Sequence, residues 1–240
     1  MTDATPEDLL AALRPEALFD LEGFAHRALF DGVTRAWEAL GARLTAYLDA
    51  HTVDRREGTI EPGAFVDGPV WLAPDATIEA GAYVRGPAIL GPGTVVRHGA
   101  YLRGYVLAGR GCILGHTTEV KNAVFLDLAS AGHFAYVGDS ILGRRVNLGA
   151  GTKLANFRVF PGNVKLALEG GARLDTGLEK LGAILGDDVA IGCNAVTAPG
   201  TVVGRRTRIY SLASVRGLIP ADRRVAVRPN LEVSPLGAGP

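Results

Sequence analysis

Three basic residues recur at a fixed interval and suggest a site for an anion. Arg85, Arg103 and Lys121 are 18 positions apart. If the fold stacks these positions, their cationic groups repel one another, and a phosphate or carboxylate in front of them offsets that repulsion through charge-assisted hydrogen bonds. The alternative is a solvated stripe of charge that binds nothing. The spacing therefore raises the hypothesis of an anionic substrate.

Histidines follow a similar interval. His98 and His116 are 18 positions apart, and His133 comes 17 positions later. Stacked imidazoles suit a zinc-like ion, and a set of three histidines resembles the metal site of metal-dependent carbonic anhydrases, so a metal-dependent hydratase is one interpretation. His133 also stands between glycine and aromatic residues where the surrounding repeat is interrupted, and such interruptions are expected at functional positions. A histidine that is simply hydrogen-bonded in a loop is the alternative.

A hexapeptide repeat predicts the elements that would stack these residues. From Ile60 to Leu126 an apolar residue recurs at every sixth position, and a small or β-branched residue follows four positions later. A helix would scatter positions six apart around its axis, whereas a parallel β-helix of hexapeptides places them all on an inward-facing line. Three hexapeptide strands then make one coil, so positions 18 apart are stacked. Residues one coil apart should lie about 4.8 Å from each other, so the fold class is an all-β solenoid.

The repeat also divides the chain. We predict an N-terminal helical region over 1–55, a β-helix over 56–228 interrupted by a hairpin excursion at 157–180, and a frayed tail over 229–240. Helices are expected to about Leu13 and from about Val33 to Ala50. We expect about seven or eight coils, and we expect the second helix to cover the open lower coil, because solenoid ends expose apolar residues and strand edges.

Composition narrows the function classes. The formal net charge is zero, which argues against a nucleic-acid or anionic-membrane partner. Two cysteines, Cys112 and Cys193, are too few for a disulfide framework. The chain starts without a basic segment followed by an apolar run, and no apolar stretch approaches the roughly 20 residues that span a bilayer. We therefore expect a cytoplasmic protein.

Three motifs resemble one enzyme family. They are Glu119-Val120-Lys121, the run from Gly132 to Asp139 that reads GHFAYVGD, and the run from Asn147 to Thr152 that reads NLGAGT, followed by Asn156. Together they resemble the acetyltransferase half of bacterial bifunctional N-acetylglucosamine-1-phosphate uridyltransferase/glucosamine-1-phosphate acetyltransferase and the related sugar-1-phosphate nucleotidyltransferases. The resemblance covers about Ile60 to Arg228. It implies a left-handed β-helix and a homotrimer.

The resemblance also implies roles for individual residues. It makes His133 the catalytic base, and it makes Arg103 and Lys121 the pair that holds the sugar phosphate. Tyr136 and Asn156 match residues that contact the amino sugar. The resemblance further implies acetyl-CoA as a co-substrate, with no metal expected, and the positions that match its binding are Ala150, Ser211 and Arg228.

Several positions depart from the family. Phe157 stands where the family has tyrosine, Cys193 replaces a small hydroxyl residue near the thioester, and the hairpin replaces a lysine-bearing loop, leaving Lys165 as a possible substitute. The segment 1–55 offers no glycine-rich, arginine-containing nucleotide loop, so we do not expect uridylyl transfer.

Three functions remain open. The first is an acetyl-CoA-dependent acyltransferase that N-acetylates an amino-sugar 1-phosphate. The second is a non-catalytic trimeric scaffold or regulatory homologue, and the third is the metal-dependent hydratase.

Overall fold

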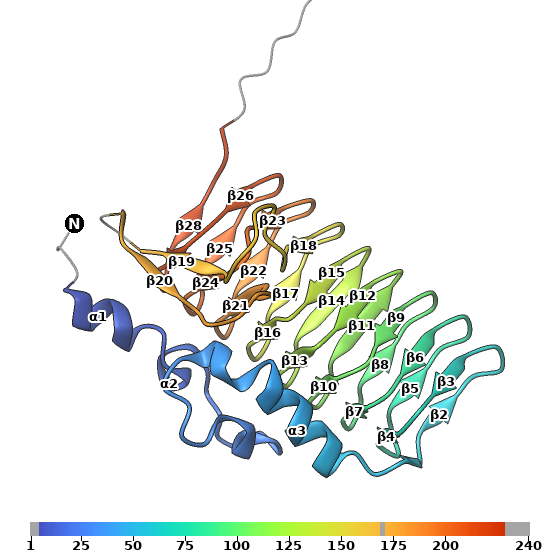
Figure 1. The fold of residues 1–240 in the computed structure, drawn as a ribbon. Helices are drawn as coiled ribbons and strands as arrows, with labels where there is room; N and C mark the ends of the chain where they lie inside the picture. Colours follow the sequence, from blue (N-terminus) through green and yellow to red (C-terminus); the bar gives the residue numbers. More distant parts are fainter. Residues whose placement is uncertain (1–4, 169–170, 229–240) are drawn as a thin grey trace, which may run out of the picture.

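The chain forms a three-sided prism of parallel strands with a helical layer along one side (Figure 1). The structure is a computed structural model and describes residues 5–168 and 171–228. Each coil contributes one strand to each of three sheets, which we call A, B and C in chain order. The predicted β-solenoid of hexapeptide repeats is confirmed. Sheets A and B each contain nine strands within the described residues, more than the seven or eight coils expected, because strands pair both before and after the part of the sequence with clear hexads.

The strands of sheet A are β1 (Arg55–Arg56), β4 (Val70–Leu72), β7 (Ala88–Leu90), β10 (Val106–Ala108), β13 (Ala123–Phe125), β16 (Ile141–Leu142), β21 (Ala183–Leu185), β24 (Thr201–Val203) and β27 (Leu218–Ile219). Those of sheet B are β2 (Thr59–Ile60), β5 (Thr77–Ile78), β8 (Val95–Val96), β11 (Ile113–His116), β14 (Ser130–His133), β17 (Asn147–Leu148), β22 (Ala190–Ile191), β25 (Arg208–Ile209) and β28 (Arg224–Val225). Those of sheet C are β3 (Phe65–Asp67), β6 (Tyr83–Arg85), β9 (Tyr101–Arg103), β12 (Glu119–Lys121), β15 (Tyr136–Gly138), β18 (Lys153–Leu154), β23 (Val196–Thr197) and β26 (Ser214–Val215).

The register explains why His133 is one position out of phase. Arg85 pairs with Arg103, 18 positions later, but His116 pairs with His133, 17 positions later. The chain shortens two successive coils by one residue without losing the parallel ladder, as Val106 pairs with Ala123 and Val124 with Ile141. Residues that the sequence spaces unevenly are therefore stacked neighbours.

The N-terminal region contains α1 (Pro6–Ala11), α2 (Pro15–Leu18), two 3₁₀ helices, η1 (Arg27–Phe30) and η2 (Ala36–Ala39), and α3 (Ala42–His51). The helix predicted from Val33 to Ala50 is wrong in its first half. Gly41 has φ of +59°, a left-handed conformation that favours glycine and interrupts a helix. Within the described residues, none of the helices is long and apolar enough to cross a membrane.

The position predicted for the N-terminal region is also wrong. Its apolar residues do not close the lower end of the prism but pack on the outer face of sheet A, as Figure 1 shows for α3. The outward-facing residues of successive sheet A strands join Leu44 and Leu48 of α3 in one cluster. These sheet residues are Trp71, Ile89, Leu107, Val124, Ile141, Ile184, Val202 and Leu218. Sheet A is thus buried on both faces, inside the prism and under the layer.

The excursion at 157–180 contains an antiparallel pair, β19 (Lys165–Ala167) and β20 (Arg173–Asp175), closed by a bridge between Phe157 and Lys180. Its apolar side folds back, because Val164 and Leu166 are each only 1% exposed. The predicted tail over 229–240 lies outside the described residues.

Candidate functional site

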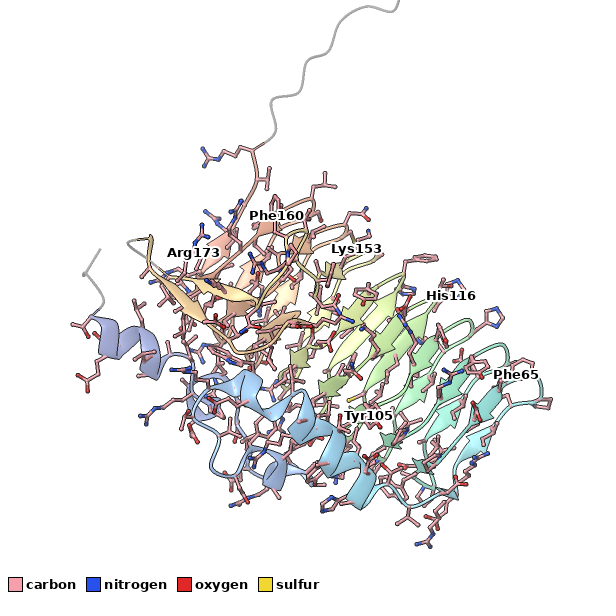
Figure 2. All side chains as sticks on the ribbon, in the orientation of Figure 1. Phe65, Tyr105, His116, Lys153, Phe160 and Arg173 are labelled. Carbon is pink, nitrogen blue, oxygen red and sulfur yellow. The ribbon has the colours of Figure 1, made fainter. Side chains whose placement is uncertain are left out.

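His133 ends β14 at the B–C edge, the line of turns where the chain passes from sheet B to sheet C. Its side chain is exposed. The backbone N–H of Gly151 donates to the carbonyl oxygen of His133 at 3.0 Å, which places the glycine-rich turn one coil above it. Figure 2 shows His116, the neighbour of His133 in the ladder, at the side of the prism remote from α3.

The three histidines do not form one stack. The rings of His98 and His116 lie 5.7 Å apart, but the next ring along the edge is Phe134, 5.2 Å from His116. Nδ1 of His98 and Nδ1 of His116 each contact a backbone carbonyl oxygen, at 2.6 and 2.9 Å. Across residues 5–168 and 171–228, no group of three His, Cys, Asp or Glu side chains has the arrangement of a metal site.

The basic column carries its own counter-ions. Nε of Arg85 lies 3.7 Å from Oδ2 of Asp67, and Nη1 of Arg103 lies 2.7 Å from Oε1 of Glu119. The hydrogen bond from Arg103 to Glu119 is the main reason that the pKa of Arg103 is raised above its ordinary value. Carboxylates of the protein itself therefore offset the repulsion between these arginines, and a substrate anion in front of the column stays a prediction.

Lys121 belongs to a buried polar cluster. Its Nζ lies 3.5 Å from Oδ2 of Asp139, and the two side chains are only 15% and 12% exposed. Nδ2 of Asn122 donates to Oδ1 of Asp139 at 3.0 Å, and Nδ2 of Asn156 donates to Oδ2. Tyr136 completes the cluster, since its hydroxyl donates to Oδ1 of Asn156 at 3.3 Å. We call Lys121, Asn122, Tyr136, Asp139 and Asn156 the Asp139 cluster.

The backbone around the cluster leaves room for these contacts. An added Cβ at Gly138 would lie 2.7 Å from the hydroxyl of Tyr136 and 2.8 Å from Nδ2 of Asn156, so only glycine allows both side chains to meet there. Asp139 has φ of +48°, which turns the chain out of β15 and directs the carboxylate at the cluster. Burial, followed by the charges of Glu119 and Asp139, raises the pKa of Tyr136, so its hydroxyl stays protonated and donates.

The positions assigned to acetyl-CoA follow the B–C edge above His133. The N–H of Asn194 donates to the carbonyl oxygen of Ala150 at 2.8 Å, and an added Cβ at Gly192 would lie 2.4 Å from the nitrogen of Ser211. Ala150 and Ser211 therefore lie along one edge, with the exposed Cys193 on the coil between them. Arg228 is exposed beyond β28 and is the last described residue of the chain.

The candidate residues thus form two groups. His133, Ala150 and Ser211 follow the B–C edge, whereas Lys121 and Asp139 lie at the opposite edge of sheet C, where the chain passes on to sheet A. β15 separates the two groups within one chain. Lys165 lies on the hairpin, opposite Asp175, and is exposed.

A family model described as GMPPB C-terminal domain matches residues 84–207, which is just over half of the chain. The chain belongs to the GMPPB C-terminal domain family. The matched segment contains His133, Lys121 and the rest of the Asp139 cluster, together with Arg103 and Ala150, but not Ser211 or Arg228.

Curated relatives of this GMPPB C-terminal domain protein are longer. A bifunctional sugar-1-phosphate nucleotidylyltransferase/acetyltransferase of Sulfurisphaera tokodaii is 40% identical over 99 residues, which are 41% of this chain and 24% of the relative. A bifunctional protein GlmU of Methanococcus maripaludis is 34% identical over 93 residues, which are 39% of this chain and 22% of the relative. The chain spans about a quarter of the length of these relatives. The chain is also similar to a solved structure of UDP-N-acetylglucosamine acyltransferase from Francisella novicida. The match covers 71% of this chain and 65% of the acyltransferase chain, with 13% identity and a TM-score of 0.45.

Sequence reasoning missed Asp139 and Glu119 as site residues in this GMPPB C-terminal domain protein, although both stand inside the motifs quoted for the resemblance. A signal was present, because Asn122 and Asp139 are 17 positions apart, the same interval that separates His116 and His133. That interval stacks Asp139 on Asn122, which brings the Asp139 carboxylate next to Lys121.

Proposed function

We propose that this chain is an acetyl-CoA-dependent acyltransferase that acetylates the amine of a sugar 1-phosphate. The observation that carries the proposal is the Asp139 cluster, in which a largely buried ammonium, two amides and a phenol are held on the face of sheet C. One donor of the Lys121 ammonium faces Asp139, and its other donors suit a phosphate. The loss of such a charge-assisted contact would weaken substrate binding about tenfold to a hundredfold.

His133 supplies the general base in this proposal. The amine must lose a proton as its C–N bond to the thioester carbon forms, and the proton passes to the exposed imidazole. In the Gly149–Gly151 turn, one coil above His133, the N–H groups of Gly149 and Gly151 already donate to backbone carbonyl oxygens, so the N–H of Ala150 is the group that would donate to the developing oxyanion. When the tetrahedral intermediate collapses and its C–S bond breaks, the imidazolium of His133 returns the proton to the sulfur and the coenzyme leaves as its thiol. The acetyl group passes directly to the amine, with no acyl-enzyme.

The separation of the two residue groups supports a site shared between copies. His133 and Lys121 lie at opposite edges of sheet C, so one copy would supply the base and a neighbour the phosphate contact, as in the homotrimer that the resemblance implies. Mixing the impaired His133→Ala and Lys121→Ala variants, assayed at a substrate concentration too low for the Lys121→Ala variant to bind, should then restore part of the activity, because some mixed assemblies contain one intact site. Recovery of no activity from co-assembled variants would contradict the shared site.

The main test is the release of thiol from acetyl-CoA across a panel of amino-sugar phosphates. His133→Ala should lower turnover by about 10²–10⁴-fold while coenzyme binding survives. His98→Ala, which alters an exposed histidine of the same edge, is the matched control and should leave turnover unchanged. An acetylated Cys193 trapped during turnover would overturn direct transfer.

A scaffold is the second candidate. The ion pairs of Arg85 and Arg103 favour it, since these cations already have partners in the protein. Absence of thiol release with every amino-sugar phosphate, together with an intact assembly, would support the scaffold.

A further inference from the structure

A crevice lies between the N-terminal layer and sheet A, away from the B–C edge. Its inner lobe has a volume of about 130 Å³ and is lined by His26, Trp71, Gly109, Arg110 and Asp127, among others. An outer lobe of about 330 Å³ shares His26 and Trp71 and extends to Tyr47. The outer lobe alone falls within the size range of small-molecule sites.

The inner lobe presents a carboxylate. Oδ1 of Asp127 accepts the backbone N–H of Arg110 at 2.8 Å. An added Cβ at Gly109 would lie 2.4 Å from that oxygen, so glycine lets the carboxylate sit against the turn. Within the described part of the chain, the hydrogen bonds of the Asp127 side chain involve Oδ1 only.

Asp187 lies at a position equivalent to that of Asp127, and both of its carboxylate oxygens accept hydrogen bonds. Its Oδ1 accepts the N–H of Arg144 at 2.7 Å, which repeats the contact between Asp127 and Arg110. Its Oδ2 accepts the N–H of Asp20 at 2.6 Å, from the N-terminal layer. Within the described residues, no N–H of the N-terminal layer donates to Oδ2 of Asp127. The inner lobe of the crevice is lined by this carboxylate instead.

The imidazole of His26 lines the same lobe. Its Nδ1 lies 3.0 Å from the hydroxyl of Tyr47. Burial lowers the pKa of His26 and raises that of Tyr47, so at neutral pH the phenol donates to Nδ1 and the proton of the neutral ring is on Nε2. The lobe therefore offers a donor, Nε2–H, and an acceptor, the Asp127 carboxylate. A donor and an acceptor that line one lobe suit the edge of a nucleobase, which carries both kinds of group.

The walls and the mouth fit the rest of such a ligand. The half-buried indole of Trp71 provides an apolar face on which a planar ring can stack. Arg110 is exposed, and among residues 5–168 and 171–228 its side chain has no ion-pair partner. A free guanidinium at the mouth favours an anionic substituent and disfavours an amine. We propose that this crevice is a binding site for a nucleoside monophosphate, with the base between Trp71 and Asp127 and the phosphate on Arg110.

The experiment measures binding of AMP, GMP, CMP and UMP to the full chain by calorimetry. Ribose 5-phosphate and guanosine are probes that lack the base or the phosphate. Quenching of tryptophan fluorescence reports the position, because the chain has two tryptophans and Trp37 is 1% exposed inside the N-terminal layer. At least one nucleotide should bind saturably and quench the fluorescence, and Trp71→Phe should abolish the quenching.

Substitutions locate the site. Asp127→Asn should weaken binding at least tenfold, and Arg110→Gln should remove the advantage of the nucleotide over its nucleoside. Asp222→Asn, the same change at an exposed ion pair, is the matched control and should bind normally. Thermal melting checks that each variant is folded.

Three results would overturn the proposal. They are no binding of any nucleotide at millimolar concentration, unchanged binding by a folded Asp127→Asn variant, and full displacement of the nucleotide by acetyl-CoA, whose own adenine nucleotide would then mark one common site. The proposal does not depend on acyl transfer, so it can fail or survive separately from the proposed function.

Discussion

Asp139 determines how the polar residues of sheet C are arranged. One carboxylate accepts from Asn122 and Asn156 and pairs with Lys121, although Asp139 is only 8% exposed. A buried charge is stable only if its hydrogen bonds are made, and here the partners come from successive coils. The cluster therefore stabilises the stack and also fixes the orientation of Lys121 and Asn156.

Asp139→Asn tests this role. The amide would turn a donor toward groups that are themselves donors, so the free energy of unfolding should fall by about 1.5–3 kcal/mol, the value of a hydrogen bond to a charged group. Denaturant titration measures the change. Asp222→Asn, at an exposed pair, should have a much smaller effect, and equal losses in the two variants would contradict the role assigned to Asp139.

At this scale the sequence predicted which residues share a face but not how they pair. Spacing and resemblance identified Lys121, Tyr136 and Asn156, and the structure joins all three through one cluster. The partners of Arg85 and Arg103 were not predicted, because the repeat places like charges in a column but does not say which carboxylate of the neighbouring positions reaches them.

Among the elements, sheet A differs from the other two sheets in its outward-facing residues. The middle residues of β7, β10 and β13 are apolar and fully buried under the N-terminal layer. The sequence held this signal, since the outward positions of sheet A from β4 to β27 are all apolar, whereas those of sheets B and C mix apolar residues such as Ile113 with polar ones such as Thr77 and Asn147. The hexad pattern hid it, because that pattern concerns only inward positions.

Leu107→Ala tests the contribution of the layer. Leu107 is fully buried in β10 although it points out of the prism, so its truncation should cost about 2–5 kcal/mol of unfolding free energy, as in a core. Ile113→Ala, an outward, half-exposed residue of β11 on the same coil, should cost less than half as much. Similar losses would show that the layer contributes little.

The layer should also make stability depend on pH. Burial, and then the charge of His51, holds the pKa of His26 below its ordinary value of 6.5, while Asp127 opposes the shift. The folded state thus binds this proton less tightly than the unfolded chain does. The contribution of neutral His26 to the free energy of unfolding is therefore complete above the ordinary pKa of histidine and is lost as the pH falls below that value.

His26→Gln should reduce this loss, since glutamine keeps an acceptor for Tyr47 but does not titrate. The measurement is the free energy of unfolding at about pH 7.5 and about pH 5 for both proteins. An identical decrease in the two proteins would rule out His26 as the titrating group.

For the whole molecule, the solenoid class was predictable because a hexapeptide period has few other structural solutions. The position of the helices was not predictable, because helices can cover either an open coil end or an apolar outer face. The hydrogen bonds of Leu18 and Asp20 with Asp187, far up the prism, show that the helices cover the outer face.

Those contacts have a mechanical consequence. In an ordinary solenoid each repeat touches only its neighbours, so end coils can fray while the middle persists. Here the N-terminal layer contacts many coils at once. It is hydrogen-bonded to Asp187 beside β21, packs against Trp71 of β4 and continues into β1. Opening any coil between those points therefore disrupts contacts of the whole layer. Amide hydrogen exchange should therefore show one common opening free energy from β4 to β21 and faster exchange in β28, which has no residue in the cluster under the layer.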